Sequence, residues 1–250
     1  MLDPEVISET LDALSDKDTA RRRGKHLKPF RGLRGTPVTE IAQVSSQSWK
    51  ESRTRLPEHE EALHELFCTA FEDGLVAIAL LAGAAPDVPY AALDLVDRWL
   101  PLTDDLETAD ALGWMVLGPA LLASGEPFAR SLLEHRVGPP IARRVAVLAG
   151  LAGLPVPLSG PCAAALRVRL GERHVVFVQE PRSAEVAAVL SGYVRDSDPH
   201  VRKAVGRLGR ALGECDPEVL APLLEMGGGV PRQVKGEWEK GLRKGRRKRA

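Results

Sequence analysis

The chain has few cysteines, the residues whose disulfide bonds stabilise small secreted domains. Its three cysteines, at positions 68, 162 and 215, are far apart and odd in number, so they suggest neither a disulfide framework nor a metal-binding pair. Aromatic residues make up only 4% of the 250 residues. No apolar run reaches the roughly 20 residues that a membrane-spanning helix needs, and the acidic start, MLDPE, lacks the basic and apolar pattern of a secretory signal. We therefore expect a cytoplasmic protein with no membrane partner.

Several catalytic motifs are also missing. The sequence has no glycine-rich phosphate loop followed by Lys and Ser or Thr, no serine elbow and no paired Cys/His set. His59 and His64 are five residues apart, whereas a helical zinc motif places its two histidines four apart on one face. We expect no metal ion and no cofactor.

The formal net charge of zero hides an uneven distribution. Lys and Arg together number 34, as do Asp and Glu. Residues 232–250 contain nine basic and two acidic residues, so this segment carries +7 and the remainder carries −7. A charge block of this kind is typical of a disordered arm. We predict one domain over residues 1–230 and a disordered basic tail over 231–250, which either adds affinity for phosphates or only keeps the protein soluble.

Short amphipathic helices follow one another along most of the chain, separated by Pro and Gly. Pro4–Leu14 has apolar residues three and four positions apart. In residues 198–205, DPHVRKAV, an Asp cap precedes a proline at the first helical position. Glu107–Ala123 contains two glycines and is expected to bend or break. The pattern predicts an all-α fold, a right-handed α-solenoid of HEAT-like helix pairs, with a non-repeating helical bundle as the alternative.

One segment departs from the helical pattern. Residues 166–170, LRVRL, alternate between apolar and basic, and residues 174–178, HVVFV, are rich in β-branched side chains. A turn containing Gly171 separates them, which favours a β-hairpin insertion at about residues 164–179. Arg167 and Arg169 would then share one face. The alternative is a helix that continues from Pro161 to Leu170.

Four strings of the sequence match one known family. They are FRGLRGTP at 30–37, TDDLETAD at 103–110, RRVAV at 143–147, and RKAVGRLGR at 202–210 with Asp216-Pro217 after it. Over roughly residues 20–225 the chain resembles the AlkD-type alkylpurine DNA glycosylases, which are HEAT-like repeat proteins of DNA alkylation repair. The last string is the most specific of the four, and the others are individually moderate.

The resemblance implies a candidate active site and a DNA-facing surface. It assigns the family's catalytic aspartate to Asp110. The family's two tryptophans beside that aspartate are absent, because Leu106 and Arg207 stand in their positions. We expect the phosphates of the DNA to be bound by a basic set, Arg144, Lys203, Arg207 and Arg210.

The implied chemistry is compatible with a single carboxylate. A purine alkylated at N3 or N7 is already cationic, so it leaves without a general acid, and the enzyme need only stabilise the sugar cation and position water. Branches of the family with a comparable hairpin bind branched DNA, and Arg167 and Arg169 would there contact a groove. We expect a monomer that recognises alkylated double-stranded or branched DNA at the bacterial nucleoid, and its glycosylase activity stays open.

Two other functions are left open by the sequence. HEAT-like surfaces also bind proteins, so the chain could be a non-catalytic protein-interaction scaffold. The abundance of Arg, Ala, Gly and Pro suggests a GC-rich genome, which by analogy fits self-resistance to a DNA-alkylating natural product. DNA binding at low salt that weakens on deleting residues 243–250 would favour the DNA-binding reading over the scaffold.

Overall fold

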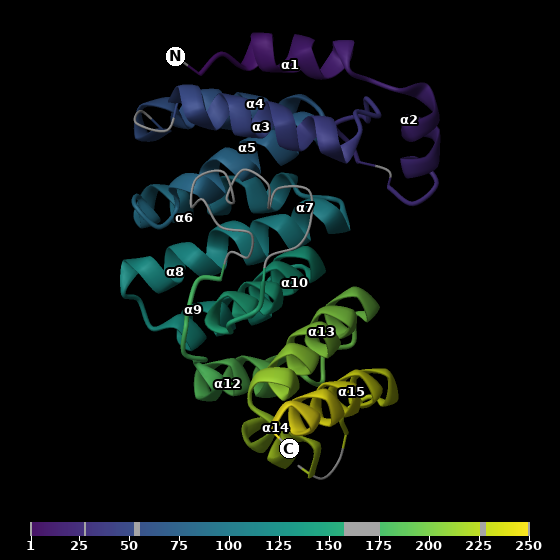
Figure 1. The fold of residues 1–250 in the computed structure, drawn as a ribbon, viewed down its shortest axis with the longest axis vertical. Coiled ribbons are helices and arrows are strands. Elements are labelled where there is room, and N and C mark those ends of the chain that lie inside the picture. Colours follow the sequence, from purple (N-terminus) through teal and green to yellow (C-terminus); the bar gives the residue numbers. More distant parts are fainter. Residues whose placement is uncertain (1, 28, 53–55, 158–175, 226–228, 250) are drawn as a thin grey trace.

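The computed structural model describes residues 2–27, 29–52, 56–157, 176–225 and 229–249, and the elements that it assigns among them are all helices. They are stacked in one elongated pile, from α1 (Pro4–Ala13) at one end to α15 (Arg232–Arg249) at the other (Figure 1). The all-α prediction is confirmed, and stacking of successive helices is consistent with an α-solenoid. The right-handed sense stays a prediction.

Consecutive helices pair, and the pairs stack into two layers. The outer members of the pairs are α4 (Glu60–Thr69), α6 (Pro89–Trp99), α9 (Phe128–Glu134), α12 (Ser183–Tyr193) and α14 (Pro217–Glu225). Their partners are α5 (Phe71–Ala84), the continuous helix that begins with α7 (Leu106–Ala111), α10 (Pro140–Ala149), α13 (Pro199–Cys215) and α15. In the second of these pairs, α6 contacts the part of the continuous helix that follows α7. The second set forms a continuous layer, because α5, α7, α10, α13 and α15 contact one another in that order.

The remaining helical elements complete the N-terminal end and the connections. At the N-terminal end α2 (Lys17–Arg23) and α3 (Val38–Ser52) follow α1, and α3 packs against α5. The connections contain short helical turns: η1 (Leu56–His59), η2 (Leu100–Leu102), η4 (His135–Val137) and η5 (Gly150–Gly153).

Local signals explain how α13 begins and which face it buries. The side chain of Asp198 accepts hydrogen bonds from the backbone N–H groups of His200 and Val201, and Pro199 occupies the first helical position. The inward stripe is fully buried: Val201, Ala204, Val205, Leu208 and Leu212. The predicted HEAT-type helix start at residues 198–205 is confirmed.

The helix after Asp105 changes its winding in the region where the sequence predicted a bend or a break. α7 continues without a break into a π-helical turn, η3 (Leu112–Leu117), and then into α8 (Gly118–Ser124). The wider turn brings Gly113 against α10, where a Cβ atom would clash with the Val145 carbonyl group. π-helical turns often occur at functional sites, and this one directly follows Asp110.

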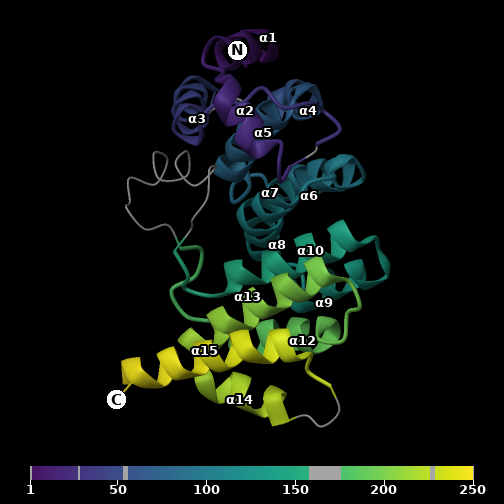
Figure 2. The same ribbon diagram turned by 90° about the vertical axis from the view of Figure 1, so that its right-hand side faces the viewer.

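The predicted disordered tail is wrong. Residues 232–249 form α15, which packs along α13 (Figure 2). Three apolar residues four positions apart, Val234, Trp238 and Leu242, are buried, and the indole N–H of Trp238 donates a 3.1 Å hydrogen bond to the Val205 carbonyl. The apolar stripe therefore outweighs the charge block, which occupies the exposed face of an amphipathic helix.

The predicted hairpin lies largely outside the residues that the structure describes, and so do Arg167 and Arg169. Of the expected second strand, residues 176–178 are described, and they form no strand. Among the described segments, no helix is long and apolar enough to span a bilayer.

Candidate functional site

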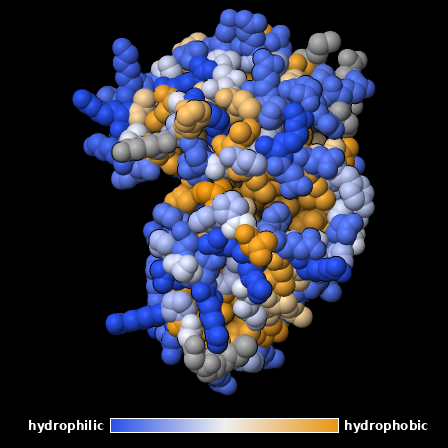
Figure 3. Space-filling view, turned by 180° about the vertical axis from the view of Figure 1, so that it is seen from behind, coloured by the Kyte–Doolittle hydropathy of each residue, from blue (hydrophilic) through white to orange (hydrophobic). Residues whose placement is uncertain are grey.

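The molecule is hollowed on one side at mid-height. The space-filling view shows a recess between the N-terminal helices above and the C-terminal helices below (Figure 3). We call this recess the notch. On the same side of the ribbon, α2 and the segment after it lie above it, α13 and α15 lie below it, and α7 and α10 lie at its level (Figure 1).

Four residues from neighbouring helices of this layer meet around the predicted catalytic aspartate. Asp110 is on α7, and Trp114 follows it by one helical turn on η3. Arg144 comes from α10 and Arg207 from α13. We call this group the Asp110 cluster. The structure thus brings together three residues that the sequence assigned to the site, Asp110, Arg144 and Arg207.

Arg144 holds one side of the Asp110 carboxylate. Its Nε donates a 2.7 Å hydrogen bond to Asp110 Oδ1, and a terminal nitrogen donates at 2.6 Å to the backbone carbonyl of His200. Arg144 is only 8% exposed. The buried guanidinium of Arg144 therefore fixes the position of the Asp110 carboxylate. Because its two partners lie on α7 and α13, Arg144 also links these helices to α10.

Arg207 approaches the other side of the carboxylate more loosely. A terminal nitrogen lies 3.4 Å from Asp110 Oδ2, and the guanidinium lies 4.8 Å from the centre of the Trp114 ring. The Arg207 side chain is 42% exposed and that of Asp110 is 28% exposed. Partial burial removes water from the guanidinium and lowers the pKa of Arg207. The negative charge of Asp110 raises this pKa, and the positive charge of Arg144 lowers it further. Arg207 is therefore a cation that an incoming anion can reach.

A pocket of about 350 Å³ adjoins the cluster. Trp114, Leu151 and Val156 give it apolar walls. Its charged lining consists of three cations and one carboxylate: Arg207, Arg210, Lys248 and Glu214. The indole N–H of Trp114 is buried and has no hydrogen-bond partner among the described residues. The volume and the mixture of apolar walls with a few cations are typical of a ligand site.

Of the two tryptophans near Asp110 in sequence, only Trp114 belongs to this site. Trp99 is fully buried, its ring is stacked at 4.3 Å on Phe67, and its N–H donates to His64 at 3.2 Å. Spacing along the run 106–124 would have favoured Trp114, because a residue four positions after Asp110 lies on the same helical face.

The basic face of α13 extends the site. Lys203, Arg207 and Arg210 are exposed and follow one another at spacings of four and three residues, so they lie on one face. Arg210 lies 3.4 Å from Glu214 and 3.3 Å from Glu237 in surface ion pairs. Lys203 has no ion-pair partner among the residues whose positions are given.

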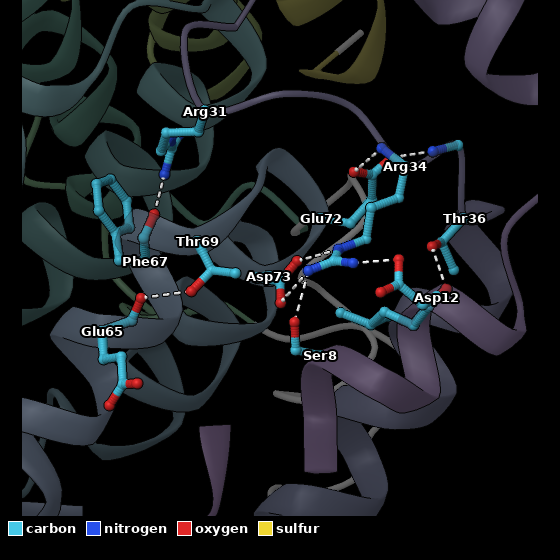
Figure 4. Close-up of polar contacts among 12 residues, drawn as sticks. Ser8, Asp12, Arg31, Arg34, Thr36, Glu65, Phe67, Thr69, Glu72 and Asp73 are labelled. Atoms are coloured by element: carbon cyan, nitrogen blue, oxygen red, sulfur yellow. Dashed lines mark hydrogen bonds and ion pairs between the residues drawn. The ribbon is translucent and has the colours of Figure 1, made fainter. Parts of the chain in front are cut away.

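Above the notch, two buried carboxylates hold the segment between α2 and α3 (Figure 4). Glu72 accepts hydrogen bonds from Arg23 at 3.1 Å and from two backbone N–H groups, at Arg34 and Gly35, at 3.0 and 2.8 Å. Asp73 accepts from Arg34 Nε at 2.7 Å. We call Arg23, Arg34, Glu72 and Asp73 the Glu72 cluster. This cluster was not predicted from the sequence.

The acidic stretch before Asp110 is partly structural. Asp105 is the N-cap of α7, accepts from the Thr108 N–H at 2.8 Å and is 5% exposed. Burial raises its pKa, while the Thr108 hydrogen bonds and the nearby Arg31 charge act in the opposite direction. Asp104 accepts a short hydrogen bond from the backbone N–H of Phe30. Within the described part of the chain, no group of three His, Cys, Asp or Glu side chains is arranged to hold a metal ion.

The chain matches one family model. The model of a family described as DNA alkylation repair enzyme matches residues 7–149, more than half of the 250 residues, and this range includes Asp110 and Arg144. A search of curated proteins found no match. The chain therefore belongs to the DNA alkylation repair enzyme family.

Proposed function

We propose that this protein binds double-stranded DNA in the notch and hydrolyses the N-glycosidic bond of cationic N3- or N7-alkylpurines, with Asp110 as the catalytic residue. The observation that carries the proposal is the Asp110 carboxylate itself. One of its oxygens is fixed by the buried Arg144, while the other faces an exposed arginine beside an apolar pocket.

The reaction needs little more than a fixed negative charge. The bond between C1′ and the purine nitrogen breaks, and its electron pair neutralises the positive charge of the alkylated base. Water then adds to C1′ and releases a proton. A carboxylate beside C1′ stabilises the sugar cation that forms between these events. Asp110 is 28% exposed, which leaves it accessible to the sugar and to water.

Arg207 supplies the link between binding and catalysis. At 3.4 Å its contact with Asp110 is longer than a normal charge-assisted hydrogen bond, which measures about 2.7–2.9 Å. A DNA phosphate can therefore draw Arg207 away, and this frees one oxygen of Asp110 when substrate arrives. Lys203 and Arg210 on the same face contribute further phosphate contacts.

The direct test uses a duplex that carries a single N7-methylguanine, with abasic-site formation as the readout. We expect release by the wild-type protein and none by Asp110→Asn. Asp94→Asn removes the same charge from an exposed position of α6 and should leave release unchanged.

A non-catalytic DNA reader is the second candidate. Arg207 favours it, because a cation 3.4 Å from Asp110 lies close to where positive charge would develop on the sugar. No release, with binding retained to alkylated or branched DNA, would establish this second function. No binding to any DNA at low salt would leave the protein-interaction scaffold.

A further inference from the structure

The most exposed large apolar residue of the described chain is Phe30, in the segment above the notch. Phe30 is 95% exposed. It follows α2, whose exposed side chains include Arg21 and Arg22, and the exposed Lys25 lies between them and Phe30. An isolated exposed apolar residue needs no explanation. Phe30 differs in how firmly its backbone is held.

Phe30 and Arg31 occupy the two central positions of a turn. The N–H of Gly32 donates a 3.2 Å hydrogen bond to the Pro29 carbonyl and closes the turn, and Gly32 has a φ of +84° that favours glycine. The two central side chains lie in opposite environments. Arg31 is buried, with its guanidinium 4.3 Å from the centre of the Phe67 ring, whereas Phe30 extends into solvent.

The turn is anchored at several points. Arg31 donates to the Phe67 carbonyl (Figure 4), and the Gly32 carbonyl accepts from the Phe71 N–H at 3.1 Å. The N–H of Phe30 itself donates to the Asp104 carboxylate. The Glu72 cluster holds the residues that follow. The backbone of Phe30 is therefore held on an anchored loop, and its side chain lies in solvent.

The anchor also places the backbone of Phe30 near the site. Asp104 precedes Asp110 by six residues, most of them helical at about 1.5 Å per residue, so the anchor lies roughly 10 Å from the aspartate. Successive base pairs are about 3.4 Å apart. The anchor of the Phe30 backbone thus lies about three base steps from Asp110.

We propose that Phe30 stacks on a DNA base within about three steps of the nucleotide at Asp110, and so holds the duplex from above the notch while the α13 cations bind phosphates from below. The inference rests on the proposed DNA binding. Exposed aromatic side chains beside cations are the usual means by which proteins hold the bases of single strands without reading their sequence. An apolar wedge can also separate two base steps and bend the duplex.

The test uses a duplex with one abasic-site analogue and 2-aminopurine at each of the three steps on either side. Stacking of Phe30 between bases should raise 2-aminopurine fluorescence at one of these steps. Phe30→Ala should abolish that rise and increase Kd about tenfold, and Phe30→Tyr should restore both. Thermal unfolding should not change, because the side chain is exposed.

Two controls separate stacking from other effects. Tyr90→Ala removes an aromatic ring that is 60% exposed on α6, in the other layer, and should leave Kd unchanged. Phe30→Ala should also leave the slope of log Kd against log salt unchanged, whereas loss of a phosphate contact lowers that slope by about one.

The outcomes distinguish this inference from the proposed function. Wild-type binding with an unchanged Kd and fluorescence signal in Phe30→Ala overturns the role of Phe30 and leaves DNA binding intact. No wild-type binding at low salt overturns both.

Discussion

Two groups of arginines and carboxylates have their carboxylates on the same layer of helices, at α5 and α7, and differ in exposure. In the Glu72 cluster both carboxylates are fully buried, and Glu72 accepts three hydrogen bonds. In the Asp110 cluster the carboxylate is 28% exposed, and it has one close partner, Arg144, and one distant partner, Arg207. The same residue types are thus used once in a closed network and once in an open one.

The difference indicates which group serves the fold and which serves a ligand. A buried carboxylate must be fully paired, because an unpaired charge in the interior costs several kcal/mol. A partly exposed carboxylate with a replaceable partner has no such requirement and can exchange that partner for substrate. Both Glu72 and Asp110 fall within residues 7–149, which match the DNA alkylation repair model.

The largest expected effect is that of Glu72→Gln on stability. The substitution leaves the Arg23 guanidinium, whose side chain is 13% exposed, without its ion-pair partner. We expect the free energy of unfolding to fall by about 3–5 kcal/mol, measured by urea denaturation. Asp110→Asn should change it by less than about 1 kcal/mol. Equal losses in the two variants would show that both clusters serve the fold.

Local signals predicted the helices, but not the contacts between distant residues. The start of α13 was predictable because Asp198 and Pro199 act on the next turn alone. The Glu72 cluster was missed because Glu72 pairs with residues 37 to 49 positions away. A signal existed, since two adjacent acids begin a helix that is buried on all sides and must therefore have partners there.

The candidate site shows the same limit. Asp110 and Arg144 came from the family resemblance, and no spacing rule relates two residues 34 positions apart. The α15 helix was missed for another reason. Its charge block was given more weight than the stripe of Val234, Trp238 and Leu242, whose spacing of four is a helical signal that the sequence does contain.

Arg144→Ala is expected to have the next largest effect on stability. It tests whether a buried residue of the Asp110 cluster serves the fold, as the residues of the Glu72 cluster do. Arg144 belongs to the open cluster but is buried, and it donates to both Asp110 and His200. We expect a loss of about 2 kcal/mol in the free energy of unfolding, since hydrogen bonds to charged groups contribute about 1.5–3 kcal/mol. Arg130→Ala, at an 80% exposed position of α9, is the matched control and should have almost no effect. An unchanged stability for Arg144→Ala would place Arg144 with the ligand-binding residues.

Arg207→Ala should have the opposite profile. Stability should change by less than about 0.5 kcal/mol, because the side chain is 42% exposed. The Kd for duplex DNA should rise, and the slope of log Kd against log salt should fall by about one. Fluorescence anisotropy titrations at several salt concentrations measure both quantities. A rise in Kd with an unchanged slope would mean that Arg207 does not neutralise a phosphate.

The smallest effect concerns Asp105, a carboxylate intermediate between the two clusters. It is buried like Glu72, but its Oδ2 has no hydrogen-bond partner among the described residues, and the nearest Arg31 nitrogen lies 3.7 Å away. Burial raises its pKa above the ordinary value of 3.8. The folded protein therefore binds this proton more tightly than the unfolded chain. The resulting stabilisation is fully present below pH 3.8 and is lost as the pH rises through the raised pKa.

Asp105→Asn removes this titration and keeps a residue that can cap α7. Urea denaturation of both proteins at a series of acid pH values gives the difference in their free energies of unfolding. We expect the stability of the wild type relative to the variant to decrease as the pH rises through that window, and to stay constant towards neutral pH. A relative stability that increases with pH would mean that the Arg31 charge outweighs burial, and Asp105 would then belong with the fully paired carboxylates of the Glu72 cluster.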